Sequence, residues 1–346
     1  MEESKEIQLE SKHRFQINNL TVEFALMGKS HVFPYKDATV TITLPKAESI
    51  AEHPDEFYIA GTSSYRMEGE KKVLLTVNVG VVNVSVKPGE SVALPSVVLG
   101  KNPIGAALIP EDVKPRLKEI GERTDDIASN AFEYWLTVMR WRCDNHRIGR
   151  PPLPGPNILW QNFLLDAESK QIVWSIAGQI RIVSHREVTT TGWADTQASL
   201  QACEEVPVYI LLLNDAREYF LRHEYRRAII DLAIACEVFM RTIVLRTLPK
   251  NLDADMRAMI EEANINQYRK KFLPNLLTKE GQVALKKLNE AHLNSLFDAR
   301  NKIMHVAKDD RATNENCTRF IKATATLFEM EKNIANPSHD SGVTTL

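Results

Sequence analysis

The stretch from Tyr225 to Leu248 constrains the fold of this chain most, because its apolar residues recur with the period of an α-helix. They form a broad stripe: Ala228, Ile229, Leu232, Ala235, Cys236, Phe239, Ile243 and Leu245. Such a stripe leaves water only when other helices cover it. We therefore predict a helical domain over residues 193–336, followed by a disordered tail over 337–346.

The sequence on either side of this stretch supplies helices that could cover the stripe. Pro207 suits a helix start, because proline is tolerated in the first turn. The helical patterns run over 207–220, 253–262, 265–272, 283–306 and 312–333. Their number and short connections predict an all-α bundle.

The first part of the chain has a different period. Residues 1–12 are charged, and we expect them to be frayed. From Phe15 to about Leu99, short β-branched and apolar runs alternate with Gly and Pro, for example at 39–44, 72–79, 81–86, 91–94 and 97–99. Several short strands with such punctuation predict a β-rich N-terminal domain over 1–110, either a sandwich or an open barrel.

Residues 111–192 contain both helical and strand patterns. Pro110-Glu111-Asp112 is a helix start, and the helical pattern continues to about Asp144, with a possible break near Thr124. After a proline-rich connector, the runs 158–164 and 171–176 predict a β-hairpin, which 179–183 extend. We expect this helix and hairpin to pack on the N-terminal domain or to belong to it. The whole chain is therefore predicted to be α+β.

Composition excludes several classes of protein. The net charge is −2, so no bulk basicity argues for tight nucleic-acid binding. The sequence has no uninterrupted apolar run of about 18 residues, so we predict no membrane span. The acidic N-terminal residues are unlike a secretory signal. The four cysteines lie far apart, which fits a reduced cytoplasmic protein without structural zinc. Nucleotide-binding and metalloprotease motifs are absent from the sequence, so we predict no cofactor and no metal.

The helix predicted over 283–306 carries the strongest functional signal. Its apolar residues Leu285, Leu288, Leu296, Ala299, Ile303 and Val306 follow a spacing of three to four that only His292 interrupts. Asn301 and His305 are four residues apart and share a ridge roughly opposite this stripe. Arg300 lies beside Asn301. We expect these three side chains to form one polar face directed away from their own core.

A polar face on an amphipathic helix is by default a solvated surface. An arginine five residues before a histidine is also a short pattern that arises by chance. A similar pair, Arg140 and His146, has Trp141 after its arginine and lies in the middle segment. His31 and His53, near loop signals, are expected to be ordinary surface histidines.

The helical region resembles the HEPN superfamily. That family's motif is an arginine, a polar residue and a histidine, spaced R-x4–6-H, late in an all-helical domain. Residues 300–305, Arg-Asn-Lys-Ile-Met-His, match it with Asn301 as the polar residue. The helix that begins at Tyr225 also resembles the family's preceding helix, with a tyrosine, a basic pair, an alanine and then Glu237. The resemblance covers about 197–335 and does not extend to 1–190.

The resemblance implies a metal-independent endoribonuclease that acts as a dimer, with two motif helices facing a shared cleft. RNA would be the substrate, and its 2′-OH the nucleophile. His305 suits proton transfer, Arg300 suits a phosphate clamp, and Asn301 could orient the phosphate or His305. Each chain has one motif histidine, whereas acid and base roles suggest two, which a dimer would supply. Similar layouts occur in prokaryotic defence and toxin proteins, where the N-terminal half would respond to a trigger or regulator.

Some assignments rest on weaker signals. Glu237 is a candidate partner of Arg300, although a surface glutamate is equally consistent with the sequence. Asp309 could orient His305 if the helix continues, and His292 fits the edge of the core. The five tryptophans precede the helical region, where they could pack between domains or stack bases. The alternative function is a catalytically silent HEPN module that binds a nucleotide, RNA or a protein.

Overall fold

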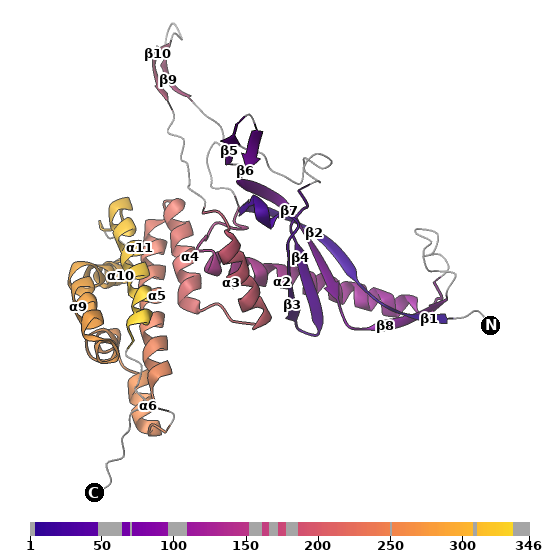
Figure 1. Cartoon of the computed structure of the whole chain (residues 1–346). Coiled ribbons are helices and arrows are strands. Elements are labelled where there is room, and N and C mark those ends of the chain that lie inside the picture. The colour runs from indigo at the N-terminus through magenta and orange to yellow at the C-terminus, as the bar shows by residue number, and fades with distance from the viewer. Residues whose placement is uncertain are drawn as a thin grey trace. The chain divides into compact units, whose positions relative to one another are not determined.

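The computed structural model describes residues 4–47, 64–69, 71–95, 109–151, 161–165, 172–177, 186–249, 251–306 and 310–334. It divides into two compact units, Met1–Glu205 and Val206–Leu346. Antiparallel strands dominate the first unit and helices form the second, which gives the mixed α+β architecture predicted from the sequence (Figure 1).

A four-stranded antiparallel sheet is the centre of the first unit. Its order is β2 (Ser11–Glu23), β7 (Thr76–Lys87), β4 (Ala38–Thr43) and β3 (Ser30–Tyr35). Side chains alternate between its faces, as the pleat requires. One face is buried and apolar, with Phe33, Val40, Ile42, Val82, Val84 and Val86 at 0–1% exposure. The opposite face carries polar side chains.

Helix α2 (Lys114–Arg142) covers the apolar face of this sheet and contacts β2, β7 and β4. Phe132 of α2 stacks on Phe15 of β2 with ring centroids 4.6 Å apart, and Trp135 is fully buried. The predicted break near Thr124 does not occur, because Thr124 is buried within the helix and its hydroxyl donates to the carbonyl of Gly121. A helix, rather than a second four-stranded sheet, thus packs against the described sheet.

The remaining described strands form antiparallel pairs. Strand β1 (Ser4–Gln8) pairs with β8 (Ser91–Pro95), β5 (Tyr65–Glu68) with β6 (Lys71–Leu74), and β9 (Gln161–Leu165) with β10 (Ile172–Ala177). The last pair is the predicted hairpin. The expectation of a frayed start is wrong from residue 4 onward, because ladder hydrogen bonds hold β1 and β2. The strands predicted at 97–99 and 179–183 lie outside the described residues.

Helix α3 (Thr190–Gln201) belongs to the first unit, where it packs on α2 and β3. The Thr189 hydroxyl caps its start by accepting from the backbone N–H of Gly192. The sequence placed the start of the helical domain at residue 193, whereas the contacts divide the chain after Glu205. Helical period alone does not show which core a helix covers.

The second unit is built around α5 (Tyr225–Thr247), which contacts α4, α10 and α11. The other helices are α4 (Val208–Leu221), α6 (Ala254–Glu261), α7 (Ile265–Gln267), α8 (Leu273–Leu276), α9 (Lys279–Leu288), α10 (Asn294–Val306) and α11 (Asn314–Glu329). Tyr209, Phe239 and Phe328 pack together in its core, with ring centroids 4.8–5.1 Å apart. Burying each large apolar side chain contributes roughly 1.5–3 kcal/mol.

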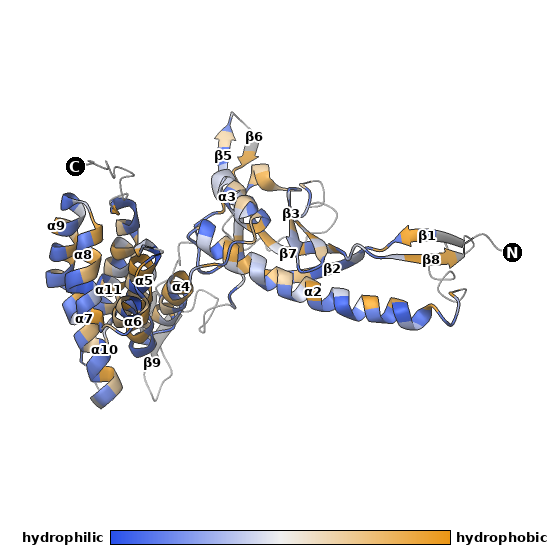
Figure 2. Cartoon of the chain, turned by 90° about the horizontal axis from the view of Figure 1, so that it is seen from below, coloured by the Kyte–Doolittle hydropathy of each residue, from blue (hydrophilic) through white to orange (hydrophobic). Residues whose placement is uncertain are grey.

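The helices are amphipathic, as the mixture of polar and apolar colour along each of them shows (Figure 2). Among the described helices, none combines the length and the apolar character needed to cross a membrane. The predicted tail over 337–346 lies outside the described residues.

Candidate functional site

The predicted helix over 283–306 is interrupted by one π-helical turn. Helix α9 ends at Leu288, the π turn covers Asn289–Leu293, and α10 begins at Asn294. The buried positions step from Leu288 to Leu293, a gap of five residues, before Leu296, Ala299 and Ile303. In a regular α-helix a step of five would rotate the side chain by about 140° away from the stripe. The wider π turn returns it to the core, so Leu293 is buried and His292 is half-buried beside it.

The π turn therefore sets which face α10 presents to the outside. Ala299 and Ile303 lie on the core side of the helix. Asn301 and His305 are exposed, and Arg300 is partly exposed. The Nη1 atom of Arg300 donates to Oδ1 of Asn301 across 3.0 Å. The three motif residues thus share the outer side of one helix, and two of them touch.

Glu237 does not pair with Arg300 among the described residues. Its carboxylate lies 3.3 Å from Nη2 of Arg241, one turn further along α5. Arg241 also donates to the backbone carbonyls of Glu261 and Ala263, across 2.7 and 2.9 Å. Glu237 is half-buried, and its partner belongs to a structural network, so the predicted pairing with Arg300 is not found. Asp309 lies outside the described residues.

Arg269 is a buried cation next to the motif helix that sequence reasoning did not identify. It is 4% exposed, and its guanidinium lies 5.3 Å from the ring centroid of Phe297 in α10. Nη2 donates to Asn266, whereas Nε and Nη1 have no hydrogen-bond partner among the described residues. Burial lowers the pKa of Arg269, and the nearby carboxylate of Asp298 opposes this. Arg269 lies in the run Arg-Lys-Lys, which resembles a solvated face in the sequence.

In the other histidine–arginine pair, Arg140 belongs to the last turn of α2 and His146 to the loop that follows it. Nε of Arg140 donates to the backbone carbonyl of Ile148 across 2.7 Å, which holds this loop against the helix. The local contact is structural, and it supports the separation of this pair from the motif in α10.

The prediction that His31 is a surface residue is wrong. His31 is fully buried and stacks on Trp193 of α3, with centroids 3.6 Å apart. Its Nδ1 accepts from the indole N–H of Trp135 across 2.8 Å, so its Nε2 carries the proton donated to the Trp193 carbonyl at 3.0 Å. Burial lowers the pKa of His31 to about 4, which leaves it neutral. His53 lies outside the described residues.

This cluster also settles the position of two tryptophans. Trp135 and Trp193 are buried inside the first unit, where both contact His31, so they are not available to stack bases. Trp141 is half-buried, with the guanidinium of Arg142 3.7 Å from its ring centroid. No potential metal-binding group of three or more His, Cys, Asp or Glu side chains occurs in the part of the chain that the structure describes.

Comparisons with protein-family models, with curated proteins and with solved structures find no match to this chain.

Proposed function

We propose that the second unit is a metal-independent endoribonuclease that uses Arg300, Asn301 and His305. The observation that carries the proposal is their common position on the outer side of α10, with Arg300 hydrogen-bonded to Asn301. These groups supply a phosphate clamp, an amide and a titratable imidazole within two turns of one helix. Their likeness to the HEPN motif is the reason for choosing RNA as the substrate.

The chemistry requires proton transfer and charge neutralisation around one phosphodiester. A base removes the proton of the 2′-OH, whose oxygen attacks the adjacent phosphorus, and an acid protonates the departing 5′-oxygen. His305 is exposed and can exchange a proton with the substrate. Arg300 retains further N–H donors for the non-bridging oxygens after its bond to Asn301. The amide NH₂ of Asn301 can donate to the same phosphate.

A second copy of the chain would complete this site. One motif histidine faces outward from α10, and it cannot serve as acid and base at the same moment. Met304, next to His305, is 59% exposed, so this face offers an apolar side chain that a second copy could cover. Packing two copies through this face would cover Met304 and bring two imidazoles to one cleft.

The direct test is cleavage of a single-stranded RNA by the full-length protein in EDTA. We expect 2′,3′-cyclic phosphate products, and we expect His305→Ala to lower the rate by at least about 100-fold, the scale of general acid–base catalysis. Lys286→Ala, which removes an exposed cation from α9, should cleave at the wild-type rate. Equal cleavage by the wild-type and His305→Ala proteins would show that the activity resides elsewhere.

The alternative of a silent module predicts a different result in the same experiment. Such a protein would bind a nucleotide or RNA without cleaving it, and His305→Ala would change binding alone. The absence of an ion pair between Glu237 and Arg300 among the described residues fits this alternative, because a silent site needs no acid beside its arginine.

The dimer is tested by placing a charge on the proposed interface. Met304→Glu should shift the protein to a monomer in sedimentation and abolish cleavage, because burying an unpaired carboxylate is costly. Val283→Glu is the matched control, since Val283 is 70% exposed and belongs to α9, before the π turn that separates it from the motif residues. A fully active Met304→Glu monomer would contradict the shared cleft.

The defence or toxin role remains part of the proposal. Expression of the wild-type protein should arrest bacterial growth, alone or after a trigger, whereas His305→Ala should not. Growth arrest by both proteins would show that the toxicity does not depend on RNA cleavage at His305.

A further inference from the structure

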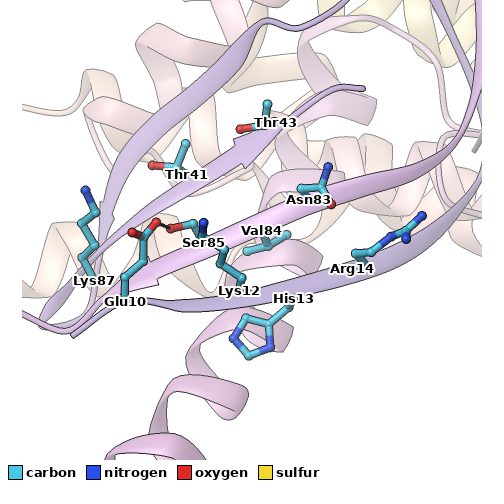
Figure 3. A pocket seen from close by; sticks show the side chains of 10 residues that line it. All are labelled: Glu10, Lys12, His13, Arg14, Thr41, Thr43, Asn83, Val84, Ser85 and Lys87. Carbon is cyan, nitrogen blue, oxygen red and sulfur yellow. Dashed lines mark hydrogen bonds between the residues drawn. The ribbon is translucent and has the colours of Figure 1, made fainter. Parts of the chain in front are cut away.

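The polar face of the four-stranded sheet contains a hollow of about 660 Å³ in the first unit. This volume falls within the roughly 300–1,000 Å³ of small-molecule sites. Strands β2, β7 and β4 supply its lining, and Figure 3 shows Thr41, Thr43, Asn83 and Lys87 projecting from the same side of the sheet. His13 projects to the other side, where its Nδ1 lies 3.5 Å from the Asp125 carboxylate of α2.

The strand register arranges the lining in rows across the sheet. Lys12 stands opposite Ser85, which stands opposite Thr41. The next row contains Arg14, Asn83 and Thr43 in the same order. Each row therefore joins a cation on β2 to polar groups on β7 and β4. Successive rows on one face of a strand lie about 7 Å apart.

The charge of this hollow favours an anion. Lys12, Arg14 and Lys87 are cationic, against one carboxylate, Glu10. Lys12 and Lys87 are exposed and form no ion pair with any residue that the structure describes. Glu10 accepts a hydrogen bond from the Ser85 hydroxyl, and this bond is the main reason that its pKa is lowered, with Lys87 and Lys12 adding to the effect. Both lysines thus lie close enough to Glu10 to stabilise its negative charge.

The lining also restricts how an anion would be recognised. Hydroxyl, amide and ammonium groups are donors suited to phosphate oxygens. None of the described lining residues is Phe, Tyr or Trp, so the hollow offers no platform on which a base could stack.

We infer that this hollow binds a small molecule through two or more phosphate groups, held by Lys12, Lys87 and Arg14 at the rim and by the hydroxyls of Thr41, Thr43 and Ser85. The inference does not depend on the ribonuclease proposal, because every residue in it belongs to the first unit. It gives that unit a ligand class, and a bound ligand would stabilise the folded unit by an amount that rises with the logarithm of its concentration above the dissociation constant.

The test is calorimetric titration of the full-length protein with inorganic tripolyphosphate and with ATP. We expect both to bind with affinities within about tenfold of each other, because the phosphates and not the base are recognised. The double variant Lys12→Gln/Lys87→Gln should weaken binding at least about tenfold, the scale of one charge-assisted hydrogen bond. Lys29→Gln, an exposed lysine outside the hollow, should bind like the wild type.

A second variant keeps the charges and removes donors. Thr41→Val/Thr43→Val preserves the β-branched shape and should also weaken binding several-fold. Unchanged binding in both double variants, or no binding of tripolyphosphate at millimolar concentration, would overturn the inference. ATP binding more than tenfold tighter would show that the base is recognised, and RNA binding without tripolyphosphate binding would make the face an RNA surface; either result overturns it as well.

Discussion

His31 and His305 show two opposite environments for the same side chain. His31 is fully buried between a sheet and two helices, and both of its ring nitrogens are hydrogen-bonded. His305 lies exposed on the outer side of α10. A histidine whose nitrogens are both engaged in a dry core is held in one tautomer and serves the fold. An exposed histidine beside an arginine and an amide can still exchange protons, so it is the better candidate for chemistry.

The largest expected effect is the loss of stability on removing His31. His31→Leu leaves the buried indole N–H of Trp135 without a partner, at about 1–3 kcal/mol, and also removes the hydrogen bond to the Trp193 carbonyl and the ring stacking. We expect the free energy of unfolding of the first unit to fall by about 4 kcal/mol. Tryptophan fluorescence during urea unfolding measures this, because the tryptophans at 135, 141, 160, 174 and 193 all belong to the first unit.

The matched control for this variant is His13→Leu. His13 is also on the sheet, but it is partly exposed, and its polar partners Ser11 and Asp125 can turn to water, so its removal should cost less than that of His31. Equal losses from both variants would mean that the hydrogen bonds of His31 contribute little.

The second effect is a dependence of the first unit on pH. The pKa of His31 is lowered from 6.5 to about 4, so the unfolded chain binds the proton more readily than the folded chain. Stability is therefore complete above about pH 6.5 and is lost as the pH falls toward 4, by about 3 kcal/mol in total. Urea unfolding of the wild type and of His31→Leu at pH 7.5 and 4.5 isolates the contribution of His31 to the pH dependence, because the variant has no imidazole at this position. A parallel decline in both proteins would assign the pH dependence to other groups.

The third effect concerns a buried group that is not fully bonded. Arg269→Met removes a buried charge with two unpartnered donors, and its lost partner Asn266 is exposed to water. We expect the second unit to gain about 1 kcal/mol, because a well-packed apolar side chain can replace a poorly satisfied buried charge. Circular dichroism at 222 nm during thermal unfolding measures the gain, with the partly exposed Arg257→Met as the control. A loss of more than 1 kcal/mol would show that Arg269 is needed to hold α10.

The smallest effect is expected at His305 itself. His305→Ala should change the stability of the second unit by less than about 0.5 kcal/mol, the usual range for surface substitutions. Thermal unfolding followed by circular dichroism measures this change. Phe320→Ala is the positive control, because Phe320 is only 1% exposed and its truncation should cost about 3–5 kcal/mol. A large loss at His305 would make it structural and would remove the contrast with His31.

Several features of the fold could be predicted from the spacing of apolar residues and from the positions of glycine and proline. The stripe of α5 predicted a buried central helix, and its residues Ala228, Ile229, Leu232 and Phe239 are 0–1% exposed. The hairpin β9–β10 followed from two apolar runs around a polar turn. Gly80 was misleading, since β7 continues through it to Lys87 in one strand. The pairing with β2 shifts at this point, from Gln16 opposite Val81 to Leu20 opposite Val79, so Gly80 marks an irregularity within one strand and not its end.

The candidate site was accessible to sequence reasoning in part. The positions of Arg300, Asn301 and His305 on the outside of α10 could be derived from the spacing of Ala299 and Ile303. The rim of the sheet hollow could not, because Lys12, Lys87 and Thr41 are separated in sequence and meet only through strand register. Arg269 was also missed, because burial of a charged residue depends on neighbours from other helices.

The sequence alone determined that the chain contains a strand-rich part and a helical part, and that a polar triad occupies one helix. The tertiary structure decided two things that local pattern does not encode. It inserted the π turn at Asn289–Leu293, which lets the apolar residues of α9 and of α10 face the same core. It also placed His31 between Trp135 and Trp193, which joins α3 to the first unit. The physical reason is common to both: apolar periodicity specifies that a face is buried, but only packing against distant segments specifies the partner and the register.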